Sequence, residues 1–276
     1  MTTAAPSKAA ALLHARYGDA APPLGPVNEI ITHLLSHRSV RAFLPRRLPE
    51  GTLEMLVAAA QSASTSSNLQ AWSVLAVEEP AHKSRLAELA GQQDFIRQAP
   101  LFLAFLADHA RLGRVGAARR TQLEGLDYTE SYIIAALDAA FAAQNLMVAA
   151  ESLGLGCVYV GALRNHPEEI AQELGLPPHV MGVFGMAIGY PDPAVRAEVK
   201  PRLPQSVVLH RERYGAAAEP DAIAAYDATL KDFSAANGMG AADWSTRVIG
   251  RLATAASLHG RERIREQLRH LGFELR

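Results

Sequence analysis

The sequence predicts an α+β fold, because apolar strand-like segments alternate with helical segments, while Pro- and Gly-rich loops interrupt any regular β-α-β repeat. The expected strands are residues 72–77, 101–107, 157–163 and 183–190. The longest helix is expected at 131–153 and is apolar on nearly every side. A helix of that kind is buried, either in a large core or in a subunit interface.

Helical periodicity indicates the remaining elements. In the segment 49–62, Leu53, Leu56 and Ala60 share one face, and Pro49 is expected just inside the start of the helix. A loop of small polar residues follows, and later a basic, Gly-containing connection at 109–126. The other helices are expected at 28–36, 80–90, 220–236, 243–258 and 260–271.

Composition restricts the class of protein. With 276 residues, 49% of them hydrophobic, the chain can form a large domain with a sizeable core. A net charge of −1 provides no basic field, so we expect no nucleic-acid partner. The single cysteine, Cys157, fits a reducing compartment, and we expect a cytoplasmic protein without a membrane span. Residues 1–26, rich in Ala and Pro, are expected to form a flexible N-terminal extension.

Two cationic segments are candidates for anion binding. The segment His37-Arg38-Ser39-Val40-Arg41 places two guanidinium groups, an imidazole and a hydroxyl directly after an apolar stretch. These are charge-assisted and neutral donors suited to a phosphate, although a solvated basic helix end would look the same. In Lys200-Pro201-Arg202-Leu203-Pro204, prolines fix the backbone around Arg202, but this too is compatible with a surface loop. Together the two segments favour a phosphorylated cofactor.

Other chemistries are not supported by the spacing of residues. Gly154, Gly156 and Gly161 lie between a helix and a strand, which is the wrong order for a dinucleotide-binding fingerprint. His33 and His37 lack a third ligand, so we expect no metal site. Neither a Gly-x-Ser-x-Gly elbow nor a Walker loop is present.

Two possible nucleophiles have simpler explanations. The run 62–67 is interpreted as a polar loop rich in hydroxyl and backbone donors. Cys157 lies in an apolar run and is interpreted as a buried structural thiol. We therefore expect no catalytic side chain of the nucleophile or triad type.

Five segments in one order resemble the flavin-dependent nitroreductase family, in its oxygen-insensitive NADPH-nitroreductase and flavin-reductase branch. They are His37–Arg41, Ser64-Thr65-Ser66-Ser67-Asn68-Leu69-Gln70, Gly91-Gln92-Gln93, Gly156-Cys157-Val158-Tyr159-Val160-Gly161-Ala162-Leu163-Arg164-Asn165 and Lys200–Pro204. The resemblance covers about residues 28–276. Each segment alone is a weak signal, whereas the set is specific.

The resemblance implies a three-layer α-β-α sandwich that forms an interlocked homodimer. It implies one FMN domain over 27–276, with a helical C-terminal excursion from about 205, and active sites at the subunit interface. The residues that match the family's FMN contacts are His37, Arg38, Ser39, Arg41, Gln93, Val160, Gly161, Ala162, Lys200 and Arg202. Thr65, Ser66 and Ser67 match the loop that reaches FMN from the partner subunit.

The implied activity is ping-pong reduction of small flat acceptors, such as nitroaromatics or quinones, by NADH or NADPH through the flavin N5. The flavin supplies the chemistry, so no catalytic residue is required. The phosphate suits the first cationic segment and Arg202. Arg41 and Lys200 are expected to stabilise the negative charge of the reduced ring, and Gly161 allows close backbone approach.

One departure from the branch concerns the electron donor. Where arginines are expected to contact the extra phosphate of NADPH, residues 235–242 read Ala-Ala-Asn-Gly-Met-Gly-Ala-Ala, and Ser257 stands near another such position. Cations that could replace the missing ones are Arg114, Arg119, Arg120, Arg247 and Arg251. The loss favours weak discrimination between NADPH and NADH, or a preference for NADH. It also leaves open a flavin-binding carrier or sensor with little nicotinamide turnover.

Overall fold

The structure, a computed structural model, describes residues 7–276. Contacts between residues divide the chain into two compact units. The first unit comprises the chain up to Arg38 together with Arg196–Ser257, and the sheet unit comprises Ser39–Val195 together with Leu258–Arg276.

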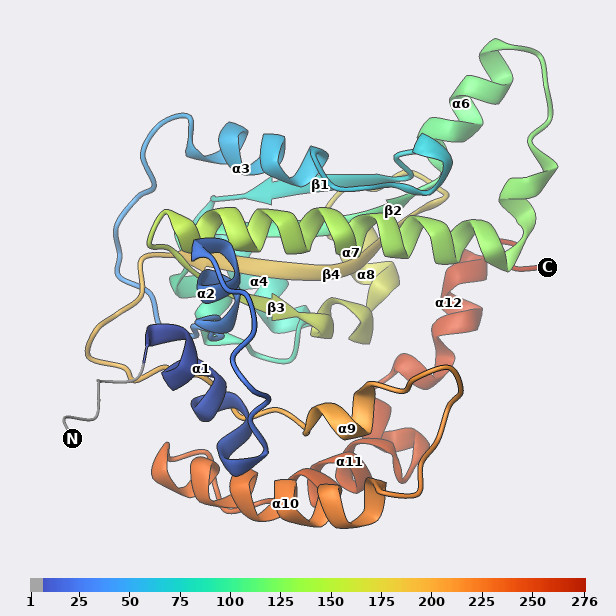
Figure 1. Cartoon of the computed structure of the whole chain (residues 1–276). Helices are drawn as coiled ribbons and strands as arrows, with labels where there is room; N and C mark the ends of the chain where they lie inside the picture. Colours follow the sequence, from blue (N-terminus) through green and yellow to red (C-terminus); the bar gives the residue numbers. More distant parts are fainter. Residues whose placement is uncertain (1–6) are drawn as a thin grey trace, which may run out of the picture. The chain divides into compact units, whose positions relative to one another are not determined.

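The sheet unit is built on four antiparallel strands in the order β1-β2-β4-β3 (Figure 1). Their bounds are Trp72–Val77 (β1), Leu101–Asp108 (β2), Gly156–Val160 (β3) and Val180–Gly189 (β4). β2 lies at the centre and every one of its residues is buried, which explains its continuous apolar sequence. Because each pair is antiparallel, the predicted α+β class is confirmed.

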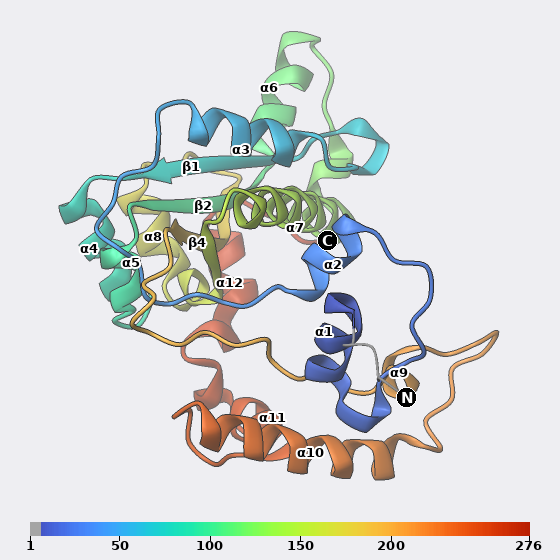
Figure 2. The same cartoon turned by 60° about the vertical axis from the view of Figure 1, so that its left-hand side comes forward.

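Helices cover both faces of the sheet (Figures 1 and 2). α7 (Thr129–Ser152) crosses one face and contacts all four strands, and α3 (Thr52–Gln61) packs against α7. Leu146 of α7 and Leu56 of α3 are fully buried in the same cluster as Leu103 of β2. Side chains alternate along a strand, so the neighbouring Phe102 faces the other layer, which includes α8 (Pro167–Glu173).

Within residues 7–276, α7 is long and apolar enough to cross a membrane by length and composition. Its contacts with all four strands identify it as the central helix of the core. The sequence-based expectation that α7 is apolar on nearly every side is reflected in three outward residues, Ile133, Leu137 and Phe141, which are 46%, 48% and 49% exposed.

The remaining helices belong to different units. In the sheet unit they are α4 (Pro80–Leu89), α5 (Asp94–Gln98), α6 (Ala110–Ala118) and α12 (Ile264–His270). In the first unit they are α1 (Lys8–Tyr17), α2 (Glu29–Leu35), α9 (Gln205–Val208), α10 (Glu219–Ala236) and α11 (Trp244–Leu252). Most of the expected helices and strands are therefore present, with shifted ends.

The structure differs from the expected flexible extension at α1. Ser7 accepts a hydrogen bond from the Ala10 N–H and caps this helix, whereas residues 1–6 lie outside the described part of the chain. The basic connection expected at 109–126 is also wrong, because it contains α6. Gly113 and Gly116 lower the helix propensity of this segment, so the sequence did not predict the helix. Gly116 has to be a glycine because α6 passes close to Leu123 at this position.

Several element ends differ for local reasons. The helix expected from Pro49 begins at Thr52, since Gly51 adopts a positive φ of 79° as its N-cap. The strand expected over 157–163 ends at Val160, where the chain turns into a 3-10 helix, Gly161–Asn165. Both changes affect only the ends of elements, which periodicity defines poorly.

Candidate functional site

Residues 39 and 40 of the first cationic segment lie along the edge strand β3. Ser39 forms a parallel bridge with Cys157, and the Val40 N–H donates a hydrogen bond of 3.0 Å to the Cys157 carbonyl oxygen. Val40 is 4% exposed, whereas Ser39 and Arg41 on either side are exposed. The segment is thus fixed through its backbone and one buried side chain, which leaves its polar side chains at the surface.

Gly156 makes this attachment possible. A Cβ atom added to Gly156 would lie 2.7 Å from the Cβ of Val40, closer than nonbonded carbon atoms approach. Any other residue at this position would move Val40 away from β3. The glycine that sequence analysis assigned to a helix-to-strand connection therefore also allows Ser39 and Arg41 to be held in place.

The donors of this segment suit an anion. Within residues 7–276, the side chains of Arg38 and Arg41 make no hydrogen bond or ion pair, and both residues are exposed. Guanidinium groups bind phosphate oxygens through two parallel charge-assisted hydrogen bonds, and the Ser39 hydroxyl adds a neutral donor. The chemistry of the donor set fits the phosphate of FMN.

In the first unit, one buried side chain contacts both cationic segments. Arg16 of α1 donates hydrogen bonds to the carbonyl oxygens of Leu35 and His37, over 3.0 and 2.7 Å. It also donates to the carbonyl oxygen of Lys200 over 3.0 Å. The predicted residues His37 and Lys200 are therefore brought together through their backbones.

The second cationic segment is held from α10 as well. The Tyr226 hydroxyl donates a hydrogen bond of 3.1 Å to the carbonyl oxygen of the buried Pro201. Burial raises the pKa of Tyr226, so the hydroxyl keeps its proton and remains a donor. Arg202 is exposed, and its guanidinium makes a hydrogen bond of 3.3 Å to the adjacent Pro201 carbonyl. Lys200 and Arg202 thus flank a fixed proline.

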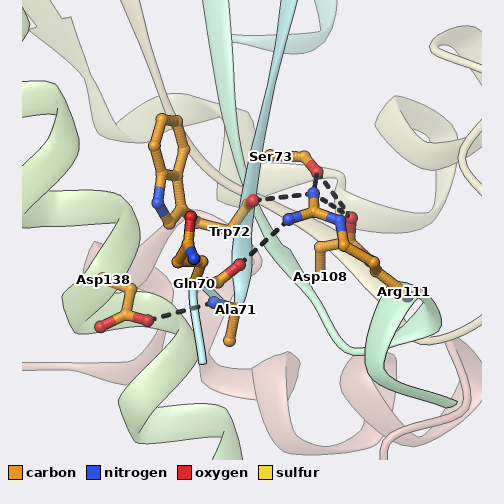
Figure 3. Close-up of polar contacts among 7 residues, drawn as sticks. All are labelled: Gln70, Ala71, Trp72, Ser73, Asp108, Arg111 and Asp138. Atoms are coloured by element: carbon orange, nitrogen blue, oxygen red, sulfur yellow. Dashed lines mark hydrogen bonds and ion pairs between the residues drawn. The ribbon is translucent and has the colours of Figure 1, made fainter. Parts of the chain in front are cut away.

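The predicted loop of Thr65, Ser66 and Ser67 is held by a carboxylate that sequence analysis missed. Asp138 of α7 is 1% exposed and accepts hydrogen bonds from the Ser66 and Ala71 N–H groups, over 3.0 and 3.1 Å (Figure 3 shows the second). Between these two anchors, Ser67, Asn68 and Gln70 have positive φ angles of 49°, 54° and 50°. Such angles are unfavourable for these residues, so contacts outside the loop must maintain its path.

Arg111 holds the far end of the same loop (Figure 3). Its guanidinium donates to the carbonyl oxygens of Gln70 and Trp72, over 3.1 and 3.0 Å. It is fixed in turn by Asp108, 3.1 Å away, whose carboxylate also accepts a hydrogen bond of 2.6 Å from Ser73. Asp108 is 6% exposed, and this pairing satisfies its charge.

Gln93 lies close to the 3-10 helix after β3. A Cβ atom added to Gly91 would lie 3.6 Å from the Asn165 amide nitrogen and 3.9 Å from the Gln93 amide nitrogen. Asn165 is held by Arg261, which donates to its side-chain oxygen over 2.8 Å. The segments Gly91–Gln93 and Gly161–Asn165, which sequence analysis treated as separate motifs, therefore meet.

Val160, Gly161 and Ala162 form the junction between β3 and the following 3-10 helix. The Arg164 guanidinium donates to the carbonyl oxygen of Val183, and a Cβ atom on Gly161 would lie 3.4 Å from it. This contact is tight without being a clash. Gly161 is therefore packed against the Arg164 side chain.

Two of the cations considered for the extra phosphate of NADPH are occupied by backbone and hydroxyl groups of their own unit. Arg247 donates to the Ala242 carbonyl oxygen and the Ser234 hydroxyl, over 3.1 and 2.8 Å. Arg251 donates to the Ser257 carbonyl oxygen over 2.5 Å. Both side chains hold the segment around residues 235–257 in shape.

A separate cavity of about 590 Å³ lies in the sheet unit and includes none of the predicted site residues. It is lined in part by His109, Arg114, Leu123, Asp127 and His179. The His109 ring nitrogen Nε2 lies 3.0 Å from the Ser131 carbonyl oxygen, and burial lowers the pKa of His109. His109 is therefore a neutral donor that connects β2 to α7.

The described residues contain no group of three or more His, Cys, Asp and Glu side chains able to hold a metal ion. Cys157 is buried, and burial raises its pKa, so the thiol stays protonated. The interpretation of Cys157 as a structural thiol agrees with these surroundings.

Comparisons with known proteins identify the family of the chain. The sequence model described as "Nitroreductase family" matches residues 34–190, and that described as "Nitroreductase family, C-terminal domain" matches residues 200–276. The FMN reductase (NADPH) of Bacillus subtilis is 36% identical over 228 residues, which is 81% of this chain and 91% of that protein. The FMN reductase [NAD(P)H] of the same organism is 36% identical over 253 residues, covering 90% and 99%.

A solved structure has the same fold. The structure of NfrA2 from B. megaterium superimposes with a TM-score of 0.84 at 35% identity. It covers 91% of this chain and all of that protein.

We expect Asp138→Ala to free the loop of residues 66–71. Hydrogen bonds to a charged group contribute about 1.5–3 kcal/mol each, so losing both should lower the free energy of unfolding by roughly 3–6 kcal/mol. Amide hydrogen exchange at Ser66 and Ala71 should accelerate more than exchange in β2. The matched control is Asp94→Ala, which removes a carboxylate that is 79% exposed. Unchanged protection of both amides in Asp138→Ala would contradict the assigned role.

Proposed function

Because the chain belongs to the nitroreductase family, we propose that it is an FMN-dependent NAD(P)H oxidoreductase that reduces small flat acceptors, such as nitroaromatics and quinones. The observation that carries the proposal is the pair of exposed guanidinium groups, Arg38 and Arg41, which flank a hydroxyl and make no hydrogen bond or ion pair within residues 7–276. Arg38 and the Ser39 hydroxyl suit a phosphate, and Arg41 suits the negative charge of a reduced ring.

We assign the FMN phosphate to the donors of His37, Arg38, Ser39 and Arg202. Arg38 and Arg202 provide forked donors that remain charged at any physiological pH. Arg41 and Lys200 would stabilise negative charge on the ring, since cations close to a developing anion lower its energy most in a site without water. The amide of Gln93 and the backbone of Val160–Ala162 would border the ring, where Gly161 has no side chain to obstruct it.

We assign Thr65, Ser66 and Ser67 to the flavin of the partner subunit. The support is the fixed but strained path of this loop, which Asp138 and Arg111 impose from inside their own subunit. When bound, FMN would accept a hydride from the nicotinamide and pass electrons to the acceptor. The protein's part is to bind and orient both partners.

Cellular location is inferred from the thiol. The single, buried Cys157 fits a reducing compartment, so we propose that the enzyme works in the cytoplasm.

We expect the purified protein to be yellow and to release FMN, not FAD, on acid treatment. The double variant Arg38→Ala/Arg202→Ala should bind FMN at least about a hundredfold more weakly, because two charged hydrogen-bond donors to the phosphate are lost. Fluorescence titration measures the affinity, and Arg85→Ala, on an exposed helix face, is the control. Stoichiometric FMN in the double variant would refute the assigned phosphate site.

We expect weak discrimination between electron donors. Residues 235–242 contain no cation that could bind a 2′-phosphate. The nearby Arg247 and Arg251 already donate hydrogen bonds within their own segment. The ratio of kcat/KM for NADPH and NADH should lie below about tenfold, or 1.4 kcal/mol. Anaerobic bleaching of the flavin by either donor distinguishes an enzyme from a carrier. A larger NADPH preference would contradict this expectation and point to Arg114, Arg119 and Arg120.

We expect a homodimer that uses the outer face of α7. Ile133, Leu137 and Phe141 recur every four residues and are about half exposed, so they form an apolar stripe along the helix. Phe141→Glu should convert the dimer into a monomer in light-scattering measurements. Val195→Glu, at a residue that is 54% exposed outside α7, should not. A wild-type monomer with full FMN content would exclude the dimer.

A further inference from the structure

α1 lies outside both segments that the family models match, 34–190 and 200–276. Its residue Arg16 is 6% exposed, although arginine is among the residues that are almost never buried without a partner. Figures 1 and 2 show α1 beside α2, and residue contacts between these two helices support that arrangement. The position of Arg16 therefore calls for an explanation from its hydrogen bonds.

Those hydrogen bonds join two distant parts of the sequence. One terminal nitrogen, Nη1, donates to Lys200 over 3.0 Å, and the other, Nη2, donates to Leu35 and His37 over 3.0 and 2.7 Å, in each case to the carbonyl oxygen. The Arg202 N–H donates to the carbonyl oxygen of Arg16 itself over 2.8 Å. All of these residues belong to the first unit.

We propose that Arg16 is a positioning residue for FMN, and the proposal rests on the function proposed above. By fixing the carbonyl groups of His37 and Lys200 to one rigid guanidinium plane, Arg16 sets the spacing between the two cationic segments before FMN binds. A preorganised site binds more tightly because less conformational freedom is lost on binding. The three hydrogen bonds that Arg16 donates to these segments go to backbone carbonyl groups, so we expect it to act on the affinity for FMN.

The planar guanidinium is needed for this role. It presents five N–H donors in a fixed fork, whereas a lysine ammonium presents three donors from a single point on a flexible stem. Arg16→Lys keeps the positive charge but cannot hold three carbonyl groups at the same relative positions. A purely electrostatic role would survive this substitution, and a positioning role would not.

The test compares wild-type full-length chain, Arg16→Lys, Arg16→Ala and His14→Ala, which changes an exposed residue of the same helix. FMN affinity is measured by titration at a temperature well below unfolding of each chain. We expect the Kd of FMN to rise about tenfold or more in both Arg16 variants and to stay unchanged in His14→Ala. At saturating FMN, kcat should remain within about twofold of wild type. Wild-type FMN affinity in Arg16→Lys, with or without a loss in Arg16→Ala, would overturn the proposal.

A second measurement uses the wild-type chain, so it tests the proposal even if the Arg16 variants do not fold. In wild-type chain freed of flavin, the Arg202 amide should already be protected from hydrogen exchange, since the segment is positioned in advance. Protection that appears only after FMN is added would also overturn the proposal. A wild-type chain that binds no FMN in the same titration would instead refute the proposed function.

Discussion

Backbone groups in irregular segments need hydrogen-bond partners that helices and strands do not supply, and in this protein charged side chains supply them. Arg16 binds three carbonyl groups of the cationic segments. Arg111 binds two carbonyl groups, and Asp138 binds two N–H groups, at the ends of the loop from Ser66 to Trp72. Lys83 binds the Ala99 carbonyl at the end of α5. These irregular segments are thus held by charged side chains, and for the buried Arg16, Lys83 and Asp138 the hydrogen bonds offset the cost of burial.

The antiparallel sheet provides the frame to which such segments attach. β2 is central and fully buried, while β3 is an edge strand with backbone groups available for pairing. Ser39 and Val40 take up that edge, which both protects it and fixes the cationic segment. The 3-10 helix that follows β3 begins at Gly161. One strand therefore positions two of the motifs through which the chain resembles its family.

Elements with strong periodicity, such as α7 and β2, could be predicted from the sequence, because their spacing reflects contacts along one face. α1 was missed because alanine-rich sequence resembles an extension, although Ser7 at its start is a cap signal. The predicted cationic residues follow from local spacing and the family resemblance. Asp138 could not be found this way, since its partners are 72 and 67 residues away. Its only signal is a carboxylate in the apolar middle of a helix whose other acidic residues, Glu130 and Glu151, lie near its ends.

The attachment of the Ser66–Ala71 loop through main-chain atoms separates its shape from its chemistry. Asp138 and Arg111 recognise N–H and carbonyl groups that every non-proline residue possesses. Side chains of this loop can therefore be exchanged while its path is kept, provided that residues tolerant of positive φ occupy positions 67, 68 and 70. The sequence of this loop can accordingly diverge, or be varied in substitution libraries, on an unchanged scaffold.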